Sequence, residues 1–281
     1  MYKKFTAFLA IIVLVIVLNS CQQNNDADAK KNSTDAGGLP VTMDDSSKVI
    51  IDRAIAYAGG YDAWQQKKTL SYDKKSTSYD STGKVIRQTD MHLDYMMKPE
   101  YRAKLSYMLN DTAIVLVHDG QKARKFYNGK ISEEQKDIDA AWNSGFGSQY
   151  VMCVPFKLKD PGIKAEYIGQ VTLADGVPAQ IVKTSYIKGA GSNPDHIWYY
   201  YFEPGSGKLL ANSLLGKNNY WDYTRYESFE KSGGLMLPGV RKGYTADTLN
   251  RPGKLISESR HFNIAFDAAL PADHFKITDG K

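Results

Sequence analysis

The fold is decided by the stretch VIRQTDMHLDYMMKPEYRAKLSYML, residues 85–109. From position 85 to 97 the odd-numbered side chains are mostly apolar and the even-numbered ones mostly polar. The run that follows repeats this pattern, with Tyr101, Ala103, Leu105 and Tyr107 on one parity. Successive side chains of a strand point to opposite faces of a sheet, so each run predicts a strand with one buried and one solvated face.

Short turn sequences separate these two runs from further extended runs. Asp119-Gly120, Asn128-Gly129 and Asp175-Gly176 favour hairpins, because their residues accept a positive φ. Residues 197–202 are apolar on both parities, which predicts a central strand or one covered from outside. We expect a mainly β protein with few helices: a curved antiparallel sheet, or unclosed β-barrel, of about ten or eleven strands.

Two helices interrupt the strands. Ile50, Ala54, Tyr57 and Ala58 recur at helical spacing, with glycines directly after them. In the middle of the chain, residues 132–135 predict a capping box, and Ile138, Ala141 and Trp142 continue a helical stripe. We expect the N-terminal and the mid-chain helix to cover the sheet as plug or lid.

The N-terminus predicts export and lipidation. Residues 1–20 carry Lys3 and Lys4, then an apolar run, and end in Leu18-Asn19-Ser20 before Cys21, which resembles a bacterial lipobox. We therefore expect a signal peptide (1–20), a tether (21–47) from lipidated Cys21, and a single β domain (48–281). The alternative is an uncleaved anchor with an incidental cysteine. Glutamine at position 22, rather than aspartate, favours an outer-membrane lipoprotein facing the periplasm, and a position on the cell surface stays open.

Composition and motifs exclude several function classes. With 42% hydrophobic residues and a net charge of only +5, neither whole-chain disorder nor nucleic-acid binding is indicated. The five histidines are scattered singly, and no nucleophile-elbow motif occurs, so we expect no metal, no cofactor and no enzyme activity. Cys153 lies in an apolar stretch and is expected to be buried and inert. His92, between Asp90 and Asp94 on one strand face, is expected on a solvated face.

Several short motifs resemble the lipoprotein-sorting proteins of the LolA/LolB-like class. They are the helix end at 56–60, Trp64 with residues 68–70, the run YYYFEPGSGKL (199–209), the run LMLP (235–238), and the endings NIAFD (263–267) and PADHF (271–275). The resemblance covers roughly residues 48–277. It implies a curved, unclosed barrel with helices across its mouth and an apolar cavity for acyl chains. The long tether of a lipoprotein favours a membrane-bound acceptor or sensor over a soluble shuttle.

Three functions follow, and the sequence leaves them open. The first is a membrane-anchored, non-enzymatic lipoprotein that binds a lipid or acyl chain in a β cavity. Its expected ligand-binding residues are the apolar alternants and one tryptophan: Trp64, Met91, Leu93, Tyr95, Leu105 and Tyr107. These side chains equally suit a filled core, because alternation shows which face is buried and not whether it is hollow. The second is an envelope structural or assembly lipoprotein that binds a protein or glycan partner, and the third is a hydrolase or lyase with His92 or His196 as base.

Overall fold

A computed structural model describes residues 39–187, 190, 196–216, 221–248 and 251–278. The chain divides into a unit of residues 1–31 and a compact unit of residues 32–281, which contains every described residue. The signal peptide, Cys21 and most of the predicted tether therefore lie outside the described residues. No helix in the described part of the chain is long and apolar enough to cross a membrane.

Fourteen strands and three α-helices make up the described chain. The strands are β1 (Thr42–Met43), β2 (Thr69–Tyr79), β3 (Val85–Met96), β4 (Arg102–Leu109), β5 (Thr112–His118), β6 (Ala123–Tyr127), β7 (Lys130–Ser132), β8 (Ile163–Thr172), β9 (Pro178–Tyr186), β10 (Ile197–Phe202), β11 (Leu209–Leu215), β12 (Trp221–Ser232), β13 (Leu235–Ala246) and β14 (Pro252–Phe266). The helices are α1 (Asp45–Tyr57), α2 (Tyr61–Gln65) and α3 (Gln135–Met152), with a 3-10 turn, η1, at Phe156–Lys159.

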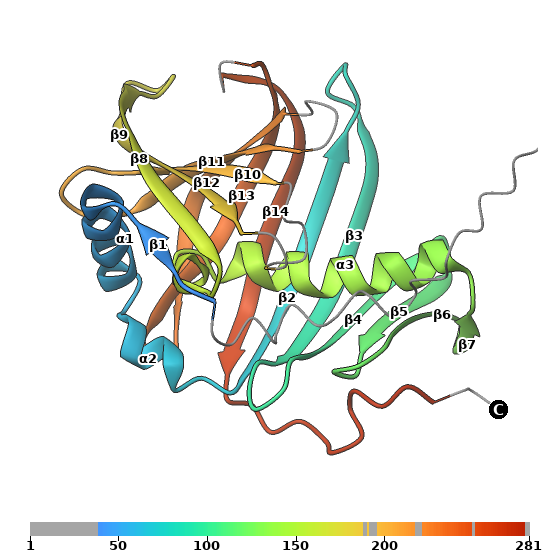
Figure 1. Cartoon of the computed structure of the whole chain (residues 1–281). Coiled ribbons are helices and arrows are strands. Elements are labelled where there is room, and N and C mark those ends of the chain that lie inside the picture. The colour runs from blue at the N-terminus through green and yellow to red at the C-terminus, as the bar shows by residue number, and fades with distance from the viewer. Residues whose placement is uncertain (1–38, 188–189, 191–195, 217–220, 249–250, 279–281) are drawn as a thin grey trace, which may run out of the picture. The chain divides into compact units, whose positions relative to one another are not determined.

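All fourteen strands belong to one sheet, in the order β1-β8-β9-β10-β11-β12-β13-β14-β2-β3-β4-β5-β6-β7. Every neighbouring pair is antiparallel except β1 and β8, which are parallel, and the edge strands β1 and β7 are not paired with each other in the described chain. The sheet is curved, and α3 crosses one of its faces, which we call the concave face (Figure 1). The predicted mainly β, unclosed sheet with few helices is confirmed, with more strands than the ten or eleven expected because short ones such as β1 and β7 have too few residues to show alternation.

The strand faces follow the predicted alternation where α3 covers them. Leu93 lies opposite Tyr72 of β2 and Leu105 of β4, so these buried side chains share the concave face. At the start of β3 the prediction is wrong for Val85, which belongs to the apolar series but is 45% exposed; Ile86, of the other series, is 64% exposed. Alternation persists in the chain there, but α3 crosses the sheet elsewhere and neither side of the strand is buried.

The strand β10 lies between β9 and β11, as its two apolar parities predicted. Its even-numbered residues join the main core, where Tyr200 is buried. Its outer side joins a smaller cluster that contains Tyr201, Ala211 and Tyr223. Strands, rather than an outer helix, therefore bury the second face of β10.

The predicted N-terminal helix is α1, which begins at Asp45 where the Asp44 side chain accepts the Ser47 N–H at 2.8 Å. Its buried residues include Ile50 and Ala54, as predicted, together with Ile51 and Ile55. Just before it, β1 pairs with β8, so the residues ahead of the helix already join the sheet.

The mid-chain helix α3 is longer than its sequence indicated. Its buried positions Asp137, Ala141, Gly145, Gln149 and Met152 recur every three or four residues and hold the helix against the sheet despite two glycines. The predicted capping box is wrong: the N-cap is Glu134, and no side chain caps it. Ser132 instead donates to Asp137 Oδ2 at 2.7 Å, because Asp137 is buried and needs partners.

Candidate functional site

Asp137 fixes the start of α3 over the concave face. Besides Ser132, its carboxylate accepts hydrogen bonds from Tyr127 at 2.9 Å and from Lys125 Nζ at 3.0 Å. The Ser132 hydrogen bond, followed by those of Lys125 and Tyr127, lowers the pKa of Asp137 to about 2 against the opposing effect of burial. A charged, fully bonded carboxylate thus holds this end of the helix in place.

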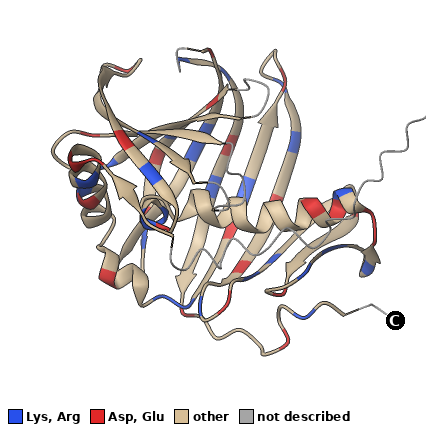
Figure 2. Ribbon diagram, viewed as in Figure 1, with Lys and Arg blue, Asp and Glu red and all other residues tan. Residues whose placement is uncertain are grey.

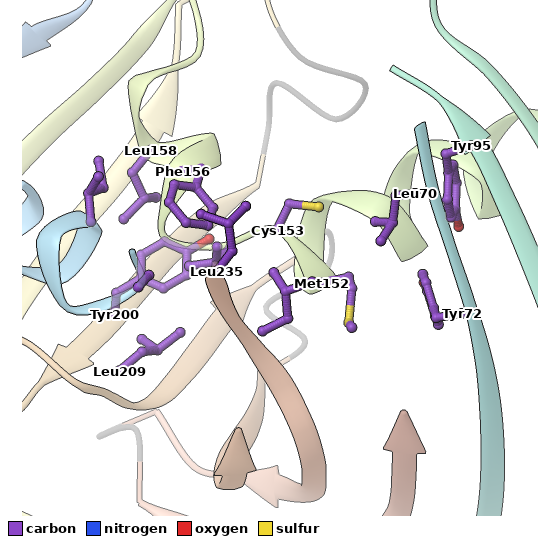
Figure 3. Packing of buried hydrophobic residues seen from close by; sticks show 14 of the residues in the cluster. Leu70, Tyr72, Tyr95, Met152, Cys153, Phe156, Leu158, Tyr200, Leu209 and Leu235 are labelled. Atoms are coloured by element: carbon purple, nitrogen blue, oxygen red, sulfur yellow. The ribbon is translucent and has the colours of Figure 1, made fainter. Parts of the chain in front are cut away.

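Beneath α3 the concave face is apolar and filled by the protein's own side chains. Tyr101 stacks on Phe146 of the helix with ring centroids 4.3 Å apart, and Tyr72 donates to the Ser148 carbonyl at 3.4 Å. Met152 and Cys153, at the end of the helix, continue this core toward Tyr200 (Figure 3). We call this region, with Leu70, Tyr72, Leu93, Tyr95 and Leu105 on the strands, the apolar half.

Cys153 is buried in this core, as predicted. Burial raises the pKa of its thiol to about 12, so the sulfur stays protonated at neutral pH. Nearby, the Tyr150 and Tyr200 hydroxyls are 3.0 Å apart and tie α3 to β10. These contacts explain why the helix closes the core as a fixed cover.

The residues predicted to bind a ligand fall into three groups. Leu93, Tyr95 and Leu105 are at most 1% exposed and lie deep in the apolar half. Met91 and Tyr107 are half-buried cross-strand neighbours at its margin. Trp64, which follows α1 in α2, is brought elsewhere: its ring stacks on Phe156 with centroids 5.0 Å apart.

One step beyond Tyr72 the concave face becomes basic. Lys74 follows on the same face of β2, flanked by Met91 of β3 and His261 of β14. Arg241 of β13 lies opposite Ser259, two residues from His261 on β14. We call Lys74, Arg241 and His261 the basic cluster. The strands that carry it show basic segments beside α3 in Figure 2.

The basic cluster has few partners of its own. In the described part of the chain neither Lys74 nor Arg241 forms an ion pair, and the Arg241 Nε and His261 Nδ1 atoms are buried without a hydrogen bond. The Arg241 guanidinium lies 5.3 Å from the centre of the Tyr226 ring. His261 meets Tyr72 edge to face at 5.6 Å, which joins the basic cluster to the apolar half.

Burial and mutual repulsion set the charges of the cluster. Burial, with the charges of Arg241 and Arg87, lowers the pKa of Lys74 to about 8. Burial, with Arg241 and Lys74, lowers the pKa of His261 to about 3. At neutral pH Lys74 therefore stays charged and His261 is neutral. Burial also raises the pKa of Asp222, on the same face of β12, to about 6 in spite of Arg241.

The sequence did not reveal this cluster. Lys74 shares the parity of Leu70 and Tyr72, which was the available signal, but a polar residue at that position equally suits an exposed strand end. Its neighbour His261 is brought to it by the pairing of β2 with β14, which joins distant parts of the chain. Nothing local in the sequence indicates that contact.

On the opposite face His92 has more partners than a solvated position would give. Its Nδ1 lies 2.7 Å from Asp73 and its Nε2 3.2 Å from Asp94, which is buried and also contacts His274 at 2.8 Å. Burial opposes protonation, but Asp73 and Asp94 together raise the pKa of His92. Its side chain is 52% exposed, so the expected solvation holds for the ring and not for Asp94.

The other residues of the catalytic alternative are not gathered with His92. Asp90, expected beside it, instead pairs with Lys75 at 3.6 Å. His196 lies against the Trp198 ring, 6.4 Å between centroids, on β10. Among the described residues, no group of three or more histidine, cysteine or acidic side chains has the arrangement of a metal site.

Comparison with known proteins gives the family and the fold. Residues 41–223 match the model of a family of unknown function, DUF6503, and the chain belongs to this family. No curated protein matches the chain. A LolA superfamily protein from Nitrosomonas europaea aligns over 82% of this chain and 97% of its own, with 8% identity and a TM-score of 0.53. A DUF1329 family protein from Desulfovibrio piger aligns over 83% and 98%, with 11% identity and a TM-score of 0.49.

The LolA-like resemblance of the sequence is thereby confirmed at the level of fold. The matched family segment runs from β1 into β12 and includes α1, α3 and the strands of the apolar half. At these identities, the likeness concerns the arrangement of the sheet and helix alone.

Proposed function

We propose that the protein is a membrane-anchored, non-enzymatic lipoprotein that binds a hydrophobic ligand, a lipid or acyl chain, on the concave face of its sheet. Lipidated Cys21 would hold it in the cell envelope, at the outer membrane facing the periplasm. Its work there would be the handling or sensing of envelope lipids or lipoproteins. The LolA-like fold supports this class of function.

The proposal depends on the margin of the apolar half, where apolar side chains are only partly buried. Met91 and Tyr107 are paired across β3 and β4 on the concave face, and both are only partly buried against the core. Beside them, Leu93 and Leu105 are fully covered. An apolar surface that begins in a closed core and ends half-open favours a hydrophobic ligand that completes it.

In this proposal Met91 and Tyr107 contact the ligand directly. Leu93, Tyr95 and Leu105 lie deeper, where α3 closes the core, and form the floor behind these two side chains. Trp64 stands apart, because its ring packs on Phe156. Contacts between α3 and the sheet, such as the Tyr150–Tyr200 hydrogen bond, keep the helix in place over the core.

Binding of the neutral apolar dye 1-N-phenylnaphthylamine to the compact unit, residues 32–281, tests the proposal. We expect the dye fluorescence to rise and saturate with protein. Met91→Asp should lower the affinity for the dye at least tenfold. The matched control is Met108→Asp, since Met108 is 57% exposed on the neighbouring strand and outside the core. Equal affinity of the two variants, or no saturable binding by the unmodified protein, would contradict the proposal.

A further inference from the structure

The basic cluster indicates which chemical class of ligand the concave face binds. Resting on the proposed function, we propose that the concave face binds an acidic amphiphile, an acyl chain with one anionic headgroup, whose headgroup lies between Lys74 and Arg241. The chain of this ligand follows Met91 and Tyr107 along the margin of the apolar half. The shared chemistry is a single carboxylate or phosphate on a long hydrocarbon chain.

Geometry places the two parts of such a ligand side by side. Lys74, Met91 and Tyr107 are successive cross-strand neighbours on β2, β3 and β4, so one row of the concave face passes from a cation to apolar side chains. Neighbouring strands are about 4.8 Å apart, so the row spans roughly 10 Å. A headgroup at Lys74 therefore leaves its hydrocarbon chain directly over the half-buried margin.

The polar atoms of the cluster lack the partners that buried groups normally have. The Arg241 Nε and His261 Nδ1 atoms are buried without a hydrogen bond in the described chain. Unpaired buried donors are costly, and a buried cation is usually paired with an acid. An anionic headgroup supplies an acceptor for the Arg241 Nε and a counter-charge for Lys74 and Arg241.

The surrounding charges favour an anion over a neutral headgroup. Arg87 lies on the same face, opposite Ser78 of β2, and adds a further positive charge. Asp222 is the acidic side chain that faces Arg241 from β12. The serines at 76, 257 and 259 share the face and offer hydroxyl donors. Charge-assisted hydrogen bonds of this kind are roughly twice as strong as neutral ones.

Three ligands with the same chain separate the headgroup from the hydrocarbon. Oleate, oleyl phosphate and oleyl alcohol each compete with 1-N-phenylnaphthylamine on residues 32–281 at pH 7. We expect one or both acids to bind at least ten times more tightly than the alcohol. Whichever of the two acids binds more tightly identifies the preferred headgroup as a carboxylate or a phosphate.

A double variant tests the residues, and its matched control lies on the other face of the same strands. Lys74→Met with Arg241→Met is expected to bring the acids within threefold of oleyl alcohol while alcohol binding persists. Lys75→Met with Lys242→Met removes two charges from the outer face, where Lys75 pairs with Asp90, and is expected to leave the preference intact. Equal binding of all three ligands by the unmodified protein, or an unchanged preference in the first double variant, overturns the headgroup assignment and leaves the proposed function standing. Failure of every ligand to bind overturns both.

Discussion

The two parts of the concave face differ in how many packing and charge partners their side chains find within the protein. Beneath α3, the apolar half is closed: Leu93 is fully buried and Tyr72 and Tyr101 contact the helix. Beyond Tyr72, Lys74 and Arg241 have no ion pair in the described chain. The apolar half therefore mainly stabilises the fold. The unpaired charges of the basic cluster lower the stability, which is typical of binding sites.

The largest expected effect is on the apolar half. Leu93→Ala leaves a cavity between Tyr72 and Leu105, and we expect it to lower the free energy of unfolding by about 3 kcal/mol. Urea denaturation of residues 32–281 measures this loss. Met108→Ala, on an exposed side chain, serves as control and should change it by less than about 0.5 kcal/mol. A similar loss in both variants would mean that this face is not the core.

The basic cluster should respond in the opposite direction. Because the pKa of Lys74 is lowered to about 8 in the folded protein, its charge opposes folding at pH 7, and Lys74→Met should raise the free energy of unfolding by about 1–3 kcal/mol. The unfolded chain binds more protons between about pH 8 and pH 10, so the stability of the unmodified protein should rise there and approach that of the variant. Denaturation curves across this pH range measure the effect. Destabilisation by Lys74→Met would show that the lysine is part of the structural core.

Asp137 tests whether α3 is a fixed cover at its first turn. Asp137→Asn removes a carboxylate that accepts three hydrogen bonds, and we expect a loss of about 2 kcal/mol at pH 7. The pKa of Asp137 is lowered to about 2, so the stability due to its charge is present above about pH 4. It is lost as the pH falls from about 4 to about 2, where variant and unmodified protein should converge. A difference that persists at pH 2 would assign the loss to packing.

The smallest expected effect concerns the middle of α3. Gly147 is exposed, has a helical backbone, and a Cβ built there meets no atom within 4 Å. Gly147→Ala should therefore raise the free energy of unfolding by about 0.5–1 kcal/mol through helix propensity alone. Thermal unfolding detects this gain. Dye affinity should stay unchanged, and a lower affinity would contradict the fixed cover that α3 forms over the core.

The sequence predicts the fold well where alternation is buried on one side. The pattern of residues 85–109 identified two central strands and placed Leu93 and Leu105 on the buried face, which the structure confirms. The same pattern failed at Val85, because burial there depends on where α3 crosses the sheet. The length of α3 was missed since Gly145 and Gly147 weaken helix propensity, while contacts with the sheet maintain the helix.

The candidate site was predictable only in its apolar part. Met91 and Tyr107 followed from strand alternation, and the structure places them side by side at the margin of the core. The basic cluster depends on the register of β2 with β14 and of β14 with β13, which brings His261 beside Lys74. Such pairings are set by the whole sheet, so a single chain read locally does not reveal them.

Native mass spectrometry with lipid extraction, on residues 32–281 purified without detergent, shows whether the concave face holds a ligand. We predict a fraction of molecules that carries one additional mass, and extraction should release an acyl-chain lipid with an anionic headgroup. The Lys74→Met and Arg241→Met double variant should lose that lipid in favour of neutral ones. If the protein shows only its own mass and also fails to take up added oleate or oleyl alcohol, the result would contradict a ligand-binding concave face. It would favour the alternative in which the surface binds a partner.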